Sequence, residues 1–192
     1  MANKNDLVVL GLVFEQDRYG YEIIQEVKRR DFEHWANINP ASIYNHLNKL
    51  EKAGALSSRT EKVGNSPERK VYSLTEEGRQ RLSELVVKAI ATPSHVDHAI
   101  ASLGIAFVYC ADEQAALGAI RNKIAVLEGV TGHLSGECGE YKEQIPLNWL
   151  LLIESAIAHV KVEQDIMNQL KEAIESGALA ESIERTAASE GS

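Results

Sequence analysis

The chain of 192 residues has few cysteines and no long apolar run. Its two cysteines, Cys110 and Cys138, are far apart in sequence and form no CxxC pair, which argues against a structural zinc site or a disulfide framework. The longest apolar segments, such as residues 150–153, are far too short to cross a bilayer. No basic segment followed by an apolar stretch opens the chain, so we expect no signal peptide and no membrane partner, and we expect a cytoplasmic protein.

Recognisable catalytic motifs are also absent. The sequence contains no GxSxG, no GxxxxGK[ST], no HExxH and no cysteine beside a plausible base, so we predict that the protein is not an enzyme. Among the histidines of the second half, only His95 and His98 have a spacing that suits metal ligands. We therefore expect neither a metal site nor a cofactor.

Charge is distributed unevenly along the chain. The net charge is −8, but residues 1–83 hold 13 Lys and Arg against 12 Asp and Glu, whereas the remainder holds 7 against 16. Binding of phosphate responds to the nearby potential rather than to the total charge, so the first half can still meet a nucleic acid. We do not expect the acidic second half to lie on DNA.

Residues 39–54 predict a helix with a polar outer face. Asn39 is a good N-cap with Pro40 at the first helical position, and Gly54 closes the other end. Ile43, Leu47 and Leu50 form a core stripe. The opposite face carries short hydrogen-bonding side chains near the helix start and lysines further along. This suits a helix that enters a major groove, although any surface helix has a polar outer face.

A hairpin and a further helix follow. Residues 56–63 and 69–74 predict two strands joined by the turn formers of 64–68, and basic side chains surround the polar tip. Such a short hairpin must lean on the preceding helices, which we expect over 5–15 and 21–30. Thr75 caps the next helix. Three helices, a hairpin and a helix make up the order of a winged helix-turn-helix.

Three stretches in this order resemble the PadR family of transcriptional regulators: Tyr19-Gly20-Tyr21-Glu22-Ile23, the segment from Ser42 to Gly54, and the segment from Arg69 to Gly78. The resemblance implies a homodimeric repressor that binds an inverted repeat in double-stranded DNA and is often released by a small-molecule effector. It makes the second stretch the recognition helix and the third the wing. It therefore implies that Ser42, Asn45 and His46 read bases, and that six further residues contact phosphates or form the wing: Tyr19, Tyr44, Lys49, Asn65, Arg69 and Lys70.

The second half predicts a helical domain. We place the boundary near Pro93, with a winged helix domain at 1–91, a helical dimerisation domain with an effector role at 92–177 and a flexible tail at 178–192. The predicted fold is thus mainly α with a small β wing, and its C-terminal part is antiparallel and helical. The long apolar stripes could pair within one chain, but their length favours an intermolecular bundle, with the dimer contact at Leu150, Ile153, Ile157 and Val160. Phe107, Tyr109 and Trp149 are candidates for an effector pocket, although core packing explains them equally well.

One rival function remains open. A winged helix that serves only as a protein-interaction module would fit the acidic total charge. The polar face of the predicted recognition helix and the basic wing argue against it. Salt dependence discriminates between the two, since affinity for DNA falls steeply as salt rises.

Overall fold

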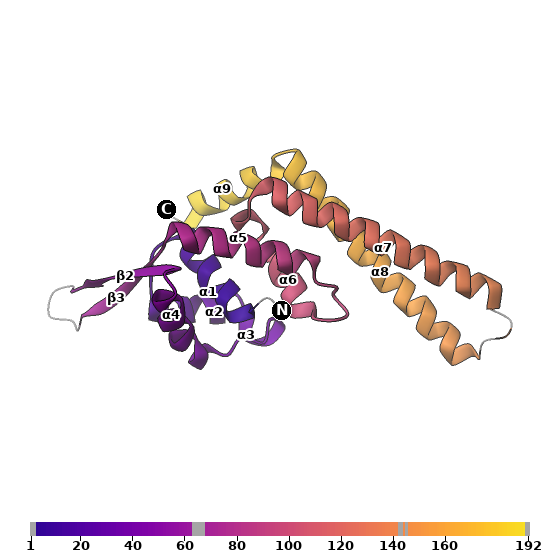
Figure 1. The fold of residues 1–192 in the computed structure, drawn as a ribbon, viewed down its shortest axis with the longest axis horizontal. Coiled ribbons are helices and arrows are strands. Elements are labelled where there is room, and N and C mark those ends of the chain that lie inside the picture. Colours follow the sequence, from indigo (N-terminus) through magenta and orange to yellow (C-terminus); the bar gives the residue numbers. More distant parts are fainter. Residues whose placement is uncertain (1–2, 63–67, 142–143, 145, 191–192) are drawn as a thin grey trace. The chain divides into compact units, whose positions relative to one another are not determined.

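The computed structural model describes residues 3–62, 68–141, 144 and 146–190, and it divides into two compact units (Figure 1). Unit 1 is Met1–Ala116 and unit 2 is Leu117–Ser192. The predicted fold class, mainly α-helical with a small β wing, is confirmed. Unit 1 contains, in chain order, α1 (Lys4–Glu15), β1 (Arg18–Tyr19), α2 (Gly20–Arg29), α3 (Phe32–Trp35), a 3-10 turn (Pro40–Ser42), α4 (Ile43–Lys52), β2 (Leu56–Glu61), β3 (Arg69–Leu74), α5 (Glu76–Ala91), α6 (His98–Ala106) and a second 3-10 turn (Val108–Cys110).

Helix α1 forms the centre of unit 1. Residues 6–13 are all buried, and the helix contacts α2, α4, α5 and α6. A helix that is apolar nearly all round has no face that favours water, so its neighbours cover it on every side. The Asn3 side chain caps its N-terminus by accepting hydrogen bonds from the backbone N–H groups of Asn5 and Asp6.

The wing is a three-stranded antiparallel sheet in the order β1-β3-β2. The long pair runs from Leu56 opposite Leu74 to Glu61 opposite Arg69. Gly54, with φ of +76°, ends α4 in the left-handed conformation and turns the chain into β2. The hairpin and the helices around it have the predicted order, whereas the two-residue strand β1 and the single-turn helix α3 were not predicted.

The boundary between the units differs from the predicted one. Helix α6 and the 3-10 turn after it belong to unit 1, because they pack against α1 and α5. Phe107 is only 1% exposed, and a Cβ added at Gly11 of α1 would lie 2.5 Å from its ring. A Cβ at Gly104 of α6 would lie 2.6 Å from the backbone nitrogen of Ile90. Because of this close packing, the first unit extends to residue 116, whereas the predicted domain ends at residue 91.

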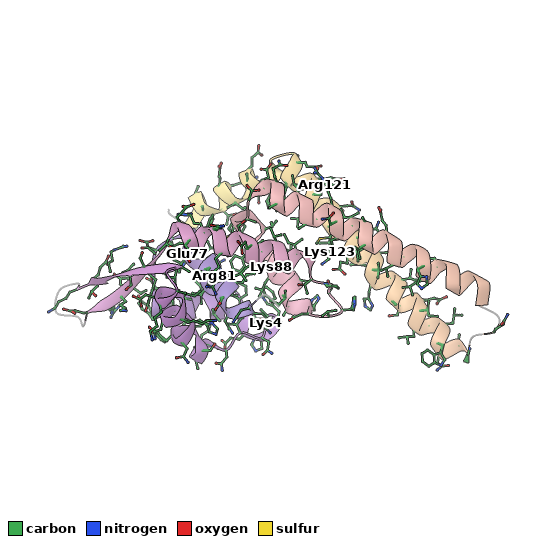
Figure 2. The ribbon with its side chains drawn as sticks, in the orientation of Figure 1. Lys4, Glu77, Arg81, Lys88, Arg121 and Lys123 are labelled. Carbon is green, nitrogen blue, oxygen red and sulfur yellow. The ribbon has the colours of Figure 1, made fainter. Side chains whose placement is uncertain are left out.

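Unit 2 is built on α7 (Glu113–Tyr141), which begins in unit 1, and on α8 (Leu147–Glu175), which runs antiparallel to it (Figure 1). The Lys123 ammonium on α7 pairs with the Glu163 carboxylate at 2.6 Å, and their side chains are 5% and 15% exposed. Arg121 also pairs across the two helices, with Glu175 at 2.8 Å; both α7 cations are labelled in Figure 2. Among the helices in the described ranges, none combines the length and the apolar character that a membrane span requires.

The C-terminal segment is helical where a flexible tail was predicted. Gly177 ends α8 with φ of +79°, and α9 (Ala178–Glu190) follows. The segment is rich in alanine and also contains leucine, glutamate and arginine, all of which have high helix propensity. Small and charged residues therefore indicate a helix here rather than an unstructured end.

Candidate nucleic-acid interface

Helix α4 presents one apolar and one polar face, as its sequence predicts. The Asn39 side chain caps the 3-10 turn that leads into it by accepting a hydrogen bond from the backbone N–H of Ala41. Ile43, Leu47 and Leu50 are fully buried and fix the helix against the core of unit 1. The opposite face is exposed at five positions, Tyr44, Asn45, Asn48, Lys49 and Lys52.

The three residues predicted to read bases do not share one environment. Asn45 is exposed on the polar face. Ser42 lies at the end of the 3-10 turn, and its hydroxyl donates a hydrogen bond to the carbonyl oxygen of Asn39 at 2.7 Å. The side chain of His46 is only 17% exposed and turns inward, with Nδ1 at 2.7 Å from Oδ1 of Asp6 on α1. The structure thus separates His46 from the exposed face that carries Asn45.

Asp6 is the common partner of the His46 ring and of two cationic side chains. Its side chain is 2% exposed. Besides His46, it meets Arg81 of α5, whose Nη2 lies 2.9 Å from Oδ2, and Lys49 of α4, whose Nζ lies 3.4 Å from the same oxygen. Lys49 is the most exposed of these partners, with 57% of its side chain exposed. Its ammonium group can therefore contact both the internal carboxylate and an external ligand.

The wing joins α4 through one acidic residue. Lys70 of β3 donates hydrogen bonds to both carboxylate oxygens of Glu51 at 3.0 and 3.1 Å, and the hydroxyl of Ser58 on β2 donates to the same carboxylate. The bonds from Ser58 and Lys70 lower the pKa of Glu51, and the bond to Glu51 raises the pKa of Lys70. This network fixes the wing against the end of α4 and partly neutralises the Lys70 charge.

Four tyrosines line an open cleft between β1, the start of α2, α4 and β3. The cleft has a volume of about 630 Å³, and Gly20, Glu68, Arg69 and Lys70 complete its lining. Tyr19 stacks on Tyr21 with ring centroids 6.0 Å apart, and the Arg69 guanidinium lies 5.5 Å from the centroid of the Tyr21 ring. The Tyr19 hydroxyl donates a hydrogen bond to Glu61 at 2.7 Å, which raises the pKa of Tyr19. The predicted phosphate residues Tyr19, Tyr44, Arg69 and Lys70 all line this cleft, whereas Asn65 lies outside the described residues.

The predicted effector residues fall in two places. Phe107 and Tyr109 lie in unit 1 with ring centroids 6.3 Å apart, and Phe107 is part of the core. The Tyr109 hydroxyl donates a hydrogen bond to Glu15 at 2.7 Å. Trp149 lies on α8 in unit 2 and is 57% exposed. For Phe107 and Tyr109, packing within unit 1 accounts for their positions.

The predicted dimer residues follow one side of α8. Leu150, Ile153, Ile157 and Val160 are all half-buried. A second set of apolar side chains on the same helix is exposed by more than 40%: Leu147, Trp149, Leu151, Leu152, Val162 and Ile166. Helical spacing places Leu152, Val162 and Ile166 on nearly the opposite side from the half-buried stripe.

Sequence reasoning missed several residues of the interface. Asp6 and Arg81 hold the inner side of α4, Glu51 links α4 to the wing, and Tyr21 and Tyr72 complete the aromatic cleft. One sequence signal for Asp6 exists, because it is the only charged residue in the otherwise apolar run of 6–13. Its three partners, however, come from positions 40, 43 and 75 residues further along the chain.

Comparison with known proteins gives consistent matches in sequence. Residues 9–84 match the model of the transcriptional regulator PadR-like family. An uncharacterized protein of Lysinibacillus sphaericus is 38% identical over 81 residues, which cover 42% of this chain and 73% of that protein. The negative transcriptional regulator PadR of Bacillus subtilis (strain 168) is 27% identical over 128 residues, 67% of this chain and 69% of that protein.

Solved structures of transcriptional regulators also match the chain, with low TM-scores. Bacillus subtilis PadR in complex with operator DNA is 21% identical, with 88% of this chain and 98% of that chain covered and a TM-score of 0.42. The same protein in complex with p-coumaric acid is 19% identical, with 90% and 96% covered and a TM-score of 0.39. A Streptococcus transcriptional regulator is 32% identical, with 42% and 75% covered and a TM-score of 0.36. The sequence matches, rather than these scores, assign the family.

Proposed function

The chain belongs to the PadR-like family of transcriptional regulators, and we propose that it represses transcription as a homodimer bound to an inverted-repeat operator. The observation that carries this proposal is the exposed polar face of α4 beside a cleft lined by tyrosines, Arg69 and Lys70. Repression is the direction suggested by the Bacillus subtilis relative, which is described as a negative regulator. Such a role requires the cytoplasm, where the chromosomal DNA lies.

In this proposal α4 enters the major groove and the wing follows the backbone. Asn45 is the base-reading residue, because an exposed carboxamide can both donate a hydrogen bond to a base edge and accept one from it. Tyr44, Lys49, Arg69 and Lys70 bind phosphates, which supply affinity without sequence information. Two copies of α4 in one dimer then bind half-sites spaced by about one helical turn of DNA.

Release by a small molecule is the regulatory part of the proposal. One solved PadR structure holds p-coumaric acid, and a comparable effector would act on this chain by favouring a conformation that does not bind DNA. The predicted effector residue that remains accessible is Trp149 on α8. Quenching of tryptophan fluorescence by an added phenolic acid, compared between the wild type and Trp149→Phe, tests its involvement.

The first experiment is a mobility-shift titration against the DNA that immediately precedes the coding sequence, with a scrambled duplex as competitor, at low and near-physiological salt. We expect a discrete complex that resists the competitor and weakens steeply as salt rises. Binding to neither duplex by a folded protein would favour the protein-interaction module. Equal binding to both would call for a selection of genomic fragments to find the operator.

Two substitutions divide the interface into its parts. Asn45→Ala should reduce the preference for operator over scrambled DNA by about 10-fold to 100-fold, because one base contact per half-site is lost. Arg69→Ala should weaken binding to both duplexes. It should also reduce the salt slope, the steepness with which log affinity falls against log salt concentration, by about one unit. Lys88→Ala is the matched control, since Lys88 pairs with Glu84 on the exposed side of α5 and lines no part of the cleft (Figure 2). An unchanged preference in Asn45→Ala would overturn the placement of α4 in the groove.

A further inference from the structure

Asp6 is a charged group in a place where charge is costly. It lies in the first turn of α1, among side chains that are fully buried, and 2% of its own side chain is exposed. A carboxylate taken out of water destabilises the fold by several kcal/mol unless hydrogen bonds and opposite charge compensate it. A neutral or apolar residue would complete this apolar run without that cost. The groups that compensate this buried charge are therefore its hydrogen-bond and ion-pair partners.

Those partners belong to the helix that we place on DNA and to the helix behind it. Oδ1 of Asp6 meets His46 of α4 at 2.7 Å. Oδ2 meets Arg81 of α5 at 2.9 Å and Lys49 of α4 at 3.4 Å. Arg81 extends from α5 on the side of α1 and α4 (Figure 2). One carboxylate thus ties α4 to both α1 and α5.

We propose that Asp6 is a positioning residue for DNA recognition, which sets the preference of the protein for its operator over other DNA. This inference rests on the proposed function. Asp6 acts in two ways. Through His46 it fixes the rotation of α4 about its own axis, which determines where the neighbouring Asn45 points. Through its charge it competes with DNA phosphates for the ammonium group of Lys49.

The two actions respond in opposite directions when the charge is removed. Asp6→Asn preserves size and one hydrogen-bond acceptor. It removes a negative charge close to the interface, so Lys49 and Arg81 attract phosphates more strongly and binding to any DNA increases. It also weakens the bond that orients His46, so Asn45 is less well placed, and on the operator this loss exceeds the gain from the removed charge. The ratio of the two affinities therefore falls.

The test compares operator and scrambled duplexes for the full-length wild type and for Asp6→Asn at two salt concentrations; the operator duplex is the fragment that the wild type prefers. We expect the variant to bind the scrambled duplex about 2-fold to 5-fold more tightly, with a salt slope steeper by up to about one unit. We expect its preference for the operator to fall about 10-fold. Asp31→Asn is the matched control, because it removes the same charge from an exposed site whose partner is His34, not α4.

His46→Gln keeps the inference testable if Asp6→Asn does not fold. It should lower the preference for the operator without tightening binding to scrambled DNA, and the double variant should lose no further preference. Equal weakening on both duplexes in Asp6→Asn, or an unchanged preference, would overturn the inference. A wild type that prefers no genomic fragment would instead overturn the proposed function on which the inference rests.

Discussion

Glu15 connects four segments of unit 1 through its carboxylate. It ends α1 and accepts hydrogen bonds from Arg30 at 2.6 Å, from Tyr109 at 2.7 Å and from Arg18 at 3.1 Å. Burial acts to raise the pKa of Glu15, but the bonds from Arg30 and Tyr109 and the two guanidinium charges outweigh it, so the pKa lies below its ordinary value. Burial also raises the pKa of Tyr109, which keeps that hydroxyl a donor.

This lowered pKa predicts how stability depends on pH. A carboxyl group whose pKa is lower in the folded state stabilises the protein above its unfolded value of about 4.5, and this contribution is lost as pH falls through the folded value. Glu15→Gln should reduce the free energy of unfolding at pH 7 by about 1–3 kcal/mol, because the donors lose a charged acceptor. Urea unfolding between pH 7 and pH 3 should show the difference from the wild type shrinking below about pH 4.5. Parallel curves would contradict this role.

At the scale of elements, the sequence predicted the helices and strands that are determined by a local pattern of residues. The helices with regular apolar spacing and the hairpin with turn formers at its tip have the predicted order. Strand β1 has only two residues and depends on pairing with Val71 and Tyr72, which are remote in sequence, and α3 is a single turn. Neither length supports a periodic pattern. The extent of unit 1 was missed because Phe107 packs against Gly11, a contact that no local window contains.

In the candidate interface, too, the sequence predicted what local pattern determines and missed what depends on residues remote in the chain. Helical spacing correctly separated the buried side of α4 from its exposed side. It could not decide the direction of His46, which lies at the margin of the two, because that depends on a carboxylate 40 residues earlier in the chain. The tyrosine cleft likewise arises from four elements, β1, α2, α4 and β3, that meet only in the folded unit.

Glycines in two helices provide an element-scale prediction with opposite signs. Gly132 of α7 is exposed, and a Cβ there would meet nothing within 4 Å. Because glycine is less favourable than alanine inside a helix, Gly132→Ala should raise the free energy of unfolding by about 0.5–1 kcal/mol. Gly104→Ala on α6 should instead lower it by about 1–3 kcal/mol, since its Cβ would lie within 3 Å of the α5 backbone. Urea unfolding of both variants measures the contrast, and a destabilised Gly132→Ala would indicate that another surface packs there.

At the scale of the whole molecule, the proposed function requires two copies of α4, and we predict that unit 2 joins the two chains. The half-buried stripe of Leu150, Ile153, Ile157 and Val160 was predicted to form the dimer contact, and that assignment remains a prediction. The exposed residues Leu152, Val162 and Ile166 on the other side of α8 offer additional apolar surface. Burying such side chains stabilises an association by about 25 cal/mol per Å² of apolar surface removed from water.

A charge placed in this exposed stripe tests whether α8 forms the dimer. Leu152→Glu should leave the fold intact, because 59% of the side chain is exposed, but it should shift the protein from a dimer toward the 21.1 kDa monomer in sedimentation velocity. Operator affinity should then fall by about 100-fold or more, since the two half-sites lose the effective concentration that linkage provides. Leu152→Met is the control, because it keeps an apolar side chain of similar volume at the same position. A variant Leu152→Glu that stays dimeric and binds the operator normally would show that this stripe is not the contact, and the corresponding substitution at Ile157 would then decide whether the half-buried stripe is.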